Sequence, residues 1–178
     1  QTETKDGTIL MARQPTDQEN EDLLFAWAVE AGVSSNSVIF SKDGATAAIG
    51  TGEQDRVGCV DLTIYKARTK YADVLAFKET GLSIYQLRQK AKADSTAAEQ
   101  VQTIEAKTIS DQAGLKGSVL VSDGFFPFRD GVELAIDQGI TAIAQPGGSL
   151  NDVEVIEAVN QADPQVAMVF TGQRSFKH

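Results

Sequence analysis

The pattern of apolar and polar residues becomes regular after residues 1–12, a polar and irregular stretch that we expect to be an arm or a remnant of a longer chain. Thr16 with Glu19 three residues later has the spacing of a capping box, in which each side chain accepts a hydrogen bond from the other residue's backbone. A helix is therefore predicted from Thr16 to Gly32. Its apolar face is expected to consist of Leu23, Leu24, Trp27 and Ala31.

Two short apolar segments, residues 37–40 and 46–49, come next and flank a strong turn signal. Asp43-Gly44 lies between them, and Asp-Gly is typical of the tight turn that joins antiparallel strands. We therefore predict a β-hairpin at this point of the chain.

The segments after the hairpin favour helices. Residues 53–70 carry Val57, Val60 and Ile64 at helical spacing, which predicts a helix that packs on the sheet. Residues 71–112 are rich in helix-forming residues and include a long polar, alanine-rich run with weak periodicity. We interpret this region as a helical excursion on the surface, without a role in an active site.

From Gly117 onward, short apolar strands alternate with helices. The predicted strands are residues 119–121, 140–144 and 166–170, and the predicted helices are about 130–138 and 151–160. Such alternation implies parallel strand pairing with helices on both faces of the sheet. We predict an α/β fold over residues 13–178: a three-layer α/β/α domain on a mixed, mostly parallel sheet of about five strands, antiparallel at the hairpin.

Composition narrows the classes of function. The 178 residues suit one compact domain or a large piece of a bigger one, and one cysteine, Cys59, with one histidine, His178, excludes a disulfide framework and a zinc site built from the Cys and His of this chain. The formal net charge of -9 opposes binding to nucleic acid or to anionic membranes. No apolar run is long enough for a membrane helix and no secretory signal pattern is seen, so we expect a cytoplasmic protein.

Ligands of such sheets bind where strands end in loops, and the first loop there is residues 50–56. Gly50 and Gly52 permit close backbone approach, and Arg56 is able to hold a phosphate or carboxylate through paired donors. Asp55 stands where a dinucleotide-binding fingerprint needs its third glycine, so that function is excluded.

A second loop, residues 122–130, places three phenylalanines, a proline and two aspartates directly after a predicted strand. The aromatic rings are suited to a slot for a flat heterocycle, with Asp130 accepting hydrogen bonds from ring nitrogens. Alternatively the aromatics plug the end of the sheet and Asp130 is a helix N-cap. Composition alone favours this second interpretation by about two to one.

The other candidates have ordinary structural explanations. The loop of residues 145–149 offers backbone amides to an anion, but a Pro-Gly turn explains it equally well. The basic terminal residues 174–178 are typically solvated, and His178 would ordinarily be frayed. Cys59 lies in an apolar helical stripe, which favours a buried small hydrophobe over a nucleophile, and Asn36 before a strand is ordinarily a turn residue.

Six collinear stretches at these same loops resemble the transformylase part of a family of bifunctional purine-biosynthesis proteins that also carry inosinate (IMP) cyclohydrolase. They cover roughly half of the chain and include the family's most specific string, SD-x-FFPFRD. The stretches are QPTDQENEDLLFAWAV at 14–29, SNSVIFSKDG at 35–44, AAIGTGEQDRV at 47–57, SDGFFPFRDGVELA at 122–135, ITAIAQPGGSLNDVEVIEA at 140–158 and VFTGQRSFKH at 169–178.

The resemblance implies a cytidine-deaminase-like fold that lacks the deaminase zinc. It implies transfer of a formyl group from 10-formyltetrahydrofolate to the 5-amino group of aminoimidazole-carboxamide ribonucleotide (AICAR), with this chain as the C-terminal part of the transformylase. A homodimer is expected, because the family's active site lies at a subunit interface.

The resemblance also assigns roles to residues of this chain. The catalytic positions, beside the AICAR carboxamide and the transferring formyl group, are Asn36 and Phe125. The positions that hold the nucleotide are Arg56, Arg174, Phe176 and His178. The positions that face the folate are Val57, Pro127, Phe128, Asp130, Gly147 and Gly148. In some members a monovalent cation such as K⁺ lies near the positions of Ser37 and Asp123.

The sequence departs from the family pattern in ways that bear on activity. The lysine-histidine pair that serves proton transfer lies in a motif upstream of this region and has no counterpart here, and the cyclohydrolase domain is absent. The usual GQ-x-SR loop reads Gly52-Glu53-Gln54-Asp55-Arg56, and residues 68–116 are longer than in many relatives. The chain is therefore expected to need an upstream transformylase half, in cis or in trans.

Two other classes of function are consistent with the residues. One is a noncatalytic nucleotide- or folate-binding module that acts as a partner subunit, and the other is a purely structural domain. The convergence of polar residues on strand ends argues against the structural domain.

Overall fold

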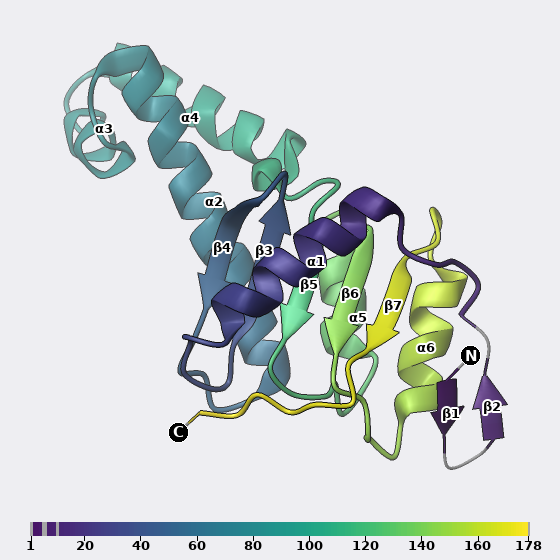
Figure 1. Cartoon of the computed structure of the whole chain (residues 1–178). Helices are drawn as coiled ribbons and strands as arrows, with labels where there is room; N and C mark the ends of the chain where they lie inside the picture. Colours follow the sequence, from purple (N-terminus) through teal and green to yellow (C-terminus); the bar gives the residue numbers. More distant parts are fainter. Residues whose placement is uncertain (1, 5–6, 10, 178) are drawn as a thin grey trace.

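A mixed five-stranded sheet forms the centre of the protein, shown in Figure 1 by a computed structural model that describes residues 2–4, 7–9 and 11–177. The strands are β3 (Val38–Lys42), β4 (Ala45–Gly50), β5 (Val119–Ser122), β6 (Ala142–Gln145) and β7 (Ala167–Phe170). The helices are α1 (Asp17–Glu30), α2 (Arg56–Thr80), α3 (Ile84–Lys90), α4 (Ser95–Ser110), the 3₁₀ turn η1 (Gln112–Gly114), α5 (Asp130–Ile136) and α6 (Asp152–Gln161). These elements lie where the sequence predicts strands and helices.

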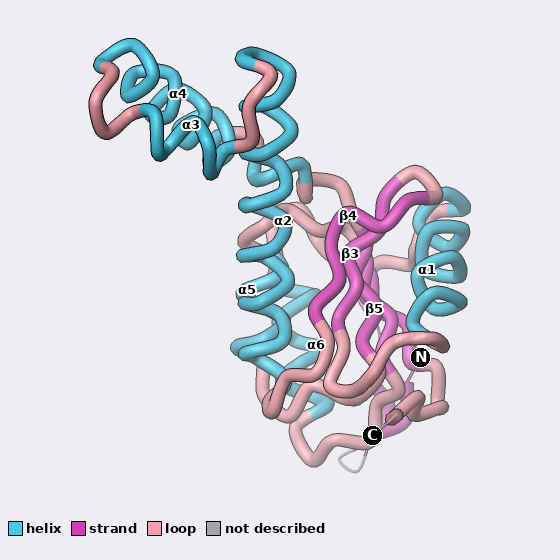
Figure 2. Tube along the Cα trace, turned by 90° about the vertical axis from the view of Figure 1, so that its left-hand side faces the viewer, coloured by secondary structure: helices cyan, strands magenta, loops and turns pink. Residues whose placement is uncertain are grey.

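The strand order is β4-β3-β5-β6-β7, in which β3 pairs antiparallel with both β4 and β5 while β5, β6 and β7 pair in parallel. Every strand of this sheet except β3 therefore runs in the same direction. Helix α1 covers one face, and α2, α5 and α6 cover the other (Figures 1 and 2). The predicted three-layer α/β/α domain on a mixed, mostly parallel sheet is confirmed.

Helix α1 begins with the predicted capping box, since the Glu19 amide donates to Thr16 Oγ1 (3.2 Å) and the Thr16 amide to Glu19 Oε2 (2.8 Å). The prediction of its buried face is partly wrong, because Leu24 is 67% exposed and Ala31 is also exposed. The buried side chains are Asp22, Leu23, Ala26 and Glu30. The two acids are buried because the hairpin segment supplies their hydrogen bonds. Asp22 accepts from the amides of Asp43 and Gly44 in the hairpin turn, and Glu30 accepts from the Ser37 hydroxyl just before β3.

The hairpin forms as predicted. Asp43 (φ 52°) and Gly44 (φ 69°) both adopt positive φ, which the tight turn between right-twisted strands requires and which Asp-Gly tolerates well. The antiparallel register pairs Val38 with Gly50, with an irregularity between Phe40 and Ser41.

Helix α2 is shifted and longer than the predicted residues 53–70. It starts at Arg56 because Asp55 caps it, accepting from the Gly58 amide at 2.6 Å, and it ends at Gly81, whose φ of 72° stops the helix. Its first half packs on the sheet. Its second half turns its small residues to α3 and α4 instead, in a separate apolar cluster of Ala72, Ala76, Ile84, Leu87, Ala97 and Ile104.

The N-terminal stretch, predicted to be an arm or a remnant of a longer chain, contains two short strands, and that prediction stays open. β1 (Thr2–Thr4) and β2 (Gly7–Ile9) pair in an antiparallel two-stranded sheet. Threonine and isoleucine favour extended backbone, and cross-strand pairing satisfies the backbone polar groups that an irregular arm leaves to water.

No helix of the described part of the chain is long and apolar enough to cross a membrane.

The ion pair between Glu19 and Arg13 predicts a pH dependence of stability. Burial acts to raise the pKa of the Glu19 carboxyl, but hydrogen bonds from Arg13 and the Thr16 amide outweigh it and lower that pKa to about 2. A glutamate carboxyl of an unfolded chain has a pKa of about 4.3. The contribution of the ion pair to the free energy of unfolding is therefore complete above that pH and is lost as the pH falls toward 2. The free energy of unfolding is measured with urea at a series of pH values. Across this window it should fall by about 1 kcal/mol more in the parent than in Glu19→Gln, because the variant has no carboxyl at this position to protonate.

The matched control is Glu21→Gln, at an exposed position of the same helix. Its free energy of unfolding should fall with pH by the same amount as that of the parent. Parallel acid profiles of Glu19→Gln and the parent would contradict the assignment.

Candidate functional site

The ends of several strands meet at one edge of the sheet. β3 runs opposite to its neighbours, so its first residue, Val38, lies beside the last residues of β4 and β5, Gly50 and Ser122. The loops that follow β4, β5 and β6 therefore reach the same edge as Asn36, which precedes β3. The C-terminal segment crosses this edge as well (Figure 1).

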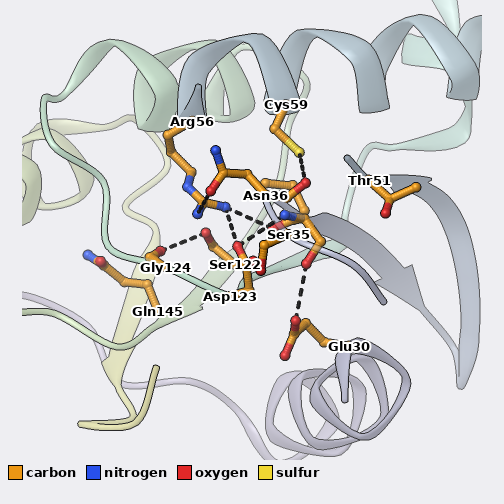
Figure 3. Close-up of polar contacts among 12 residues, drawn as sticks. Glu30, Ser35, Asn36, Thr51, Arg56, Cys59, Ser122, Asp123, Gly124 and Gln145 are labelled. Atoms are coloured by element: carbon orange, nitrogen blue, oxygen red, sulfur yellow. Dashed lines mark hydrogen bonds and ion pairs between the residues drawn. The ribbon is translucent and has the colours of Figure 1, made fainter. Parts of the chain in front are cut away.

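A buried ion pair forms the centre of this edge. Arg56 Nη1 lies 2.6 Å from Asp123 Oδ1, with 6% of the arginine side chain and none of the aspartate side chain exposed. The same Nη1 donates to the carbonyl of Ser37 (2.9 Å), and the Ser37 amide donates to Asp123 Oδ1 (3.0 Å). The ion pair thus joins the start of α2, the start of β3 and the end of β5 (Figure 3).

Asn36 attaches to this pair through its side chain. Arg56 Nη2 donates to Asn36 Oδ1 at 3.1 Å. The Asn36 carbonyl lies 3.3 Å from the thiol of Cys59. Burial raises the pKa of that thiol to about 11, so the thiolate does not form near neutral pH, and the prediction of a buried small hydrophobe is confirmed.

Glu30 is a residue of the site that sequence reasoning missed. Its side chain is 1% exposed, and the Ser37 hydroxyl donates to its Oε1 at 3.1 Å. Burial raises the pKa of the Glu30 carboxyl, and the nearby Asp123 charge adds to that effect. A signal was present, because Glu30 follows Leu23 by seven residues and Ala26 by four, the spacing of one helical face.

The C-terminal segment is bound to this edge through its backbone. The Ser175 amide donates to the Asp123 carbonyl (3.1 Å). Lys177 and Ser35 exchange two hydrogen bonds, through Lys177 N to Ser35 Oγ (2.7 Å) and Ser35 N to Lys177 O (2.8 Å). The backbone of this segment is therefore held at the strand ends, while the side chains of Arg174, Phe176 and Lys177 are exposed as expected of a solvated terminus. His178 lies outside the described residues.

Arg174 and Phe176 lie on this segment. The Arg174 guanidinium is 5.1 Å from the centroid of the Phe125 ring, a cation–π contact, while its side chain remains exposed. Phe176 is 44% exposed and lies against Gly124.

The SD-x-FFPFRD loop divides its aromatics between the core and the surface. Phe126 is fully buried and plugs the end of the sheet, whereas Phe128 is 58% exposed. The alternative in which Asp130 caps α5 is wrong: Arg129 occupies the N-cap position without a side-chain cap bond, and Asp130 is the first helical residue with an exposed carboxylate.

A cavity of about 230 Å³ lies between this loop and the start of α2. It is lined by four of the residues predicted to face the folate, Val57, Pro127, Phe128 and Asp130, together with Asp55, Arg56, Phe126 and Gly131. The cavity therefore adjoins the buried ion pair through Arg56.

Gly147 and Gly148 do not line this cavity. Both have positive φ (71° and 92°), and a Cβ at Gly147 would lie 2.4 Å from the Phe170 ring. The buried Asp152 accepts from the Gly148 amide (2.8 Å) and so fixes the loop; sequence reasoning missed this residue. The positive φ angles agree with a loop shaped by its glycines, one of the two alternatives for this segment, while contact of either glycine with folate stays a prediction.

Comparison with known proteins identifies the family. A family model described as AICARFT/IMPCHase bienzyme matches residues 1–66. The chain is 39% identical over 170 residues to the bifunctional purine biosynthesis protein PurH of Persephonella marina, and 38% identical over 170 residues to PurH of Aquifex aeolicus. With PurH of Paracoccus denitrificans it shares 39% identity over 173 residues. These alignments cover 96%, 96% and 97% of this chain.

The chain belongs to the AICARFT/IMPCHase bienzyme family. It spans about a quarter of the length of these relatives, since the alignments cover 25%, 25% and 26% of their sequences. The family resemblance of the sequence is confirmed.

The structure brings together the family-matched residues from four parts of the sequence. Asn36, Arg56 and Asp123 share one hydrogen-bonded network, and Phe125 and Arg174 are in contact beside it. In residues 2–4, 7–9 and 11–177, no three His, Cys, Asp or Glu side chains gather into a group suited to a metal ion.

The tight packing at Gly124 gives a test of this arrangement. A Cβ at Gly124 would lie 2.5 Å from Arg56 Nη2 and 2.6 Å from Phe176 Cε1, so Gly124→Ala must displace both side chains. We expect a loss of about 1–3 kcal/mol in the free energy of unfolding, the usual cost of overpacking a rigid site, measured by urea denaturation.

Gly32→Ala is the matched control, because the added Cβ meets only the Val29 carbonyl at an ordinary 3.6 Å. If Gly124→Ala were as stable as Gly32→Ala, the close approach of Arg56 and Phe176 to Gly124 would be refuted.

Proposed function

We propose that this chain is the C-terminal part of an AICAR formyltransferase, and that it binds AICAR and 10-formyltetrahydrofolate for formyl transfer in purine biosynthesis. The observation that carries the proposal is the junction at Arg56, which belongs both to the polar network around Asn36 and to the cavity beside Asp130. Two ligands bound on either side of this residue would have their reacting groups next to each other. Membership of a family with purine-biosynthesis relatives supports this assignment.

The nucleotide is assigned to the side of Asn36, Phe125 and Arg174. The exposed guanidinium of Arg174 is free to pair with a phosphate while its face stacks on Phe125. Phe176 adds an apolar surface. His178 is assigned to nucleotide binding from the family resemblance alone.

The folate is assigned to the cavity. Val57, Pro127 and Phe128 offer apolar surfaces to a flat ring, and the Asp130 carboxylate is an acceptor for ring N–H groups. A cavity of about 230 Å³ is smaller than the ~300–1,000 Å³ typical of sites that enclose a whole drug-sized ligand. It suits the pterin ring, with the rest of the folate outside.

Formyl transfer forms a bond between the AICAR amine nitrogen and the formyl carbon and breaks the bond from that carbon to folate N10. The amine loses a proton and N10 gains one. Because the amine is a weak nucleophile, the reaction needs alignment of both ligands, an acid-base pair and stabilisation of the developing oxyanion. This chain supplies alignment and binding, and an upstream transformylase half, in cis or in trans, supplies the lysine-histidine pair.

The remaining parts of the proposal concern the cation and the assembly. Asp123 Oδ2 is buried and has no hydrogen-bond partner among the described residues. Such a carboxylate oxygen is a suitable ligand for a monovalent cation such as K⁺ near Ser37, and the site needs no zinc. We place the protein in the cytoplasm and expect the family's homodimer.

The test is formyl transfer to AICAR from 10-formyltetrahydrofolate, measured with the chain alone and with the chain mixed with a polypeptide that carries the lysine-histidine half. We expect activity only in the mixture. Retained AICAR binding without turnover in the mixture would favour a noncatalytic binding module, and absence of both binding and turnover would refute the proposal.

A second prediction concerns the cavity. Asp130→Asn replaces one acceptor oxygen with a donor and should weaken binding of 10-formyltetrahydrofolate about tenfold, measured by calorimetry, because a hydrogen bond to a charged group is worth about 1.5–3 kcal/mol. Glu133→Gln removes the other carboxylate from the first turn of α5 and should leave folate affinity unchanged. Equal affinities of the two variants would remove Asp130 from the site.

A further inference from the structure

The side-chain amide of Asn36 is held in one orientation by its neighbour. Arg56 Nη2 lies 3.1 Å from Asn36 Oδ1. A guanidinium carries only donors, whereas an amide has an acceptor oxygen and a donor nitrogen. A flipped amide would place N–H groups against N–H groups, so the oxygen must face Arg56.

Arg56 itself is fixed by other bonds. Its Nη1 is bound to Asp123 Oδ1 (2.6 Å) and to the Ser37 carbonyl (2.9 Å), and only 7% of the residue is exposed. The absence of a side chain at Gly124 leaves the space next to Nη2, where a Cβ would lie at 2.5 Å. The guanidinium therefore has one position, set by β3, β5 and the loop after β5 (Figure 3).

The other end of the Asn36 amide is available to a ligand. Among the described residues, Asn36 Nδ2 donates no hydrogen bond, and the side chain is only partly buried. We propose that Arg56, held by Asp123, is a positioning residue that turns the Asn36 amide so that its NH₂ group faces the ligand. The site then offers a donor at this point, which selects a ligand oxygen, either a carbonyl or a developing oxyanion, and rejects a ligand N–H. The identity of the nucleotide rests on the proposed function, whereas the orientation of the amide does not.

The family resemblance places Arg56 among the positions that hold the nucleotide, and a double-mutant cycle tests whether it acts on the ligand through Asn36 or by a contact of its own. The probe is AICAR, and its affinity is measured for Arg56→Lys, Asn36→Ala and the double variant. A lysine keeps a positive charge opposite Asp123 but has a single centre, so it cannot also hold Asn36. If Arg56 acts through Asn36, each single change weakens binding about fivefold, the worth of one hydrogen bond, and the double variant is no weaker than Asn36→Ala. Additive losses, about 25-fold in the double variant, would overturn the proposal.

Arg68→Lys is the matched control. Arg68 lies on the same helix, and its Nη2 also donates to a side-chain amide oxygen, Gln138 Oε1 at 3.3 Å, outside the strand-end network. This variant should bind AICAR like the parent.

Asn36→Asp provides a second variant if Arg56→Lys fails to fold. Aspartate keeps an acceptor for Arg56, so the protein should remain as stable as the parent, but it has no donor for the ligand. Its affinity for AICAR should fall at least as far as that of Asn36→Ala; affinity equal to the parent would overturn the proposal.

A measurement without ligand separates this inference from the proposed function. The Asn36 side-chain NH₂ signal in ¹H–¹⁵N NMR spectra is identified by its loss in Asn36→Asp. It should move in Arg56→Lys and stay in place in Arg68→Lys, even if AICAR does not bind at all. An unmoved Asn36 signal in folded Arg56→Lys would show that Arg56 does not determine the orientation of the Asn36 side-chain amide. If AICAR does not bind but the Asn36 signal moves, the assignment of the nucleotide is refuted and the positioning role of Arg56 stands.

Discussion

The candidate site depends on one buried ion pair, between Arg56 and Asp123. Isolated charges are costly to remove from water, and the Ser37 backbone adds two hydrogen bonds to this pair: its amide donates to Asp123 Oδ1 and its carbonyl accepts from Arg56 Nη1. Among the described residues, Arg56 Nε and Asp123 Oδ2 have no hydrogen-bond partner. Truncating one partner of such a pair leaves an uncompensated buried charge, which strongly destabilises the folded state. The pair joins the first turn of α2 to the ends of two strands, so the position of that helix and the geometry of the site are set by the same contact.

The fold was largely predictable because it follows from local signals. The capping box at Thr16, the Asp43-Gly44 turn and the alternation of strands and helices after Gly117 each specify an element from residues close in sequence. Layers and strand direction then follow from general rules of chain connection. Errors arose where tertiary partners override the local pattern, as on α1, where two acids are buried and Leu24 is exposed, and in α2, which is extended by packing against α3 and α4.

The site was predictable in part. The loop positions of Asn36, Arg56 and Asp130 follow from the rule that strand ends converge, and the family resemblance supplied the roles predicted for them. No local pattern announces that Arg56 donates to Asn36, or that Glu30 is buried beneath Ser37, because these contacts join segments far apart in sequence. The ordering of the C-terminal segment was missed for the same reason, since its bonds are made to Ser35 and Asp123.

The long sequence separation of these contacts has a consequence for folding. Ser35 and Lys177 are 142 residues apart, and Arg56 and Asp123 are 67 apart. Closing such loops costs chain entropy before any contact compensates for it, so interactions of this kind form slowly and together with the rest of the fold. Helix α1 and the hairpin are local structures that a partly folded chain can form, but the strand-end network has no local precursor. A folding intermediate without the docking of β5 on β3 therefore has secondary structure but no site, and the appearance of ligand binding during refolding reports completion of the whole sheet.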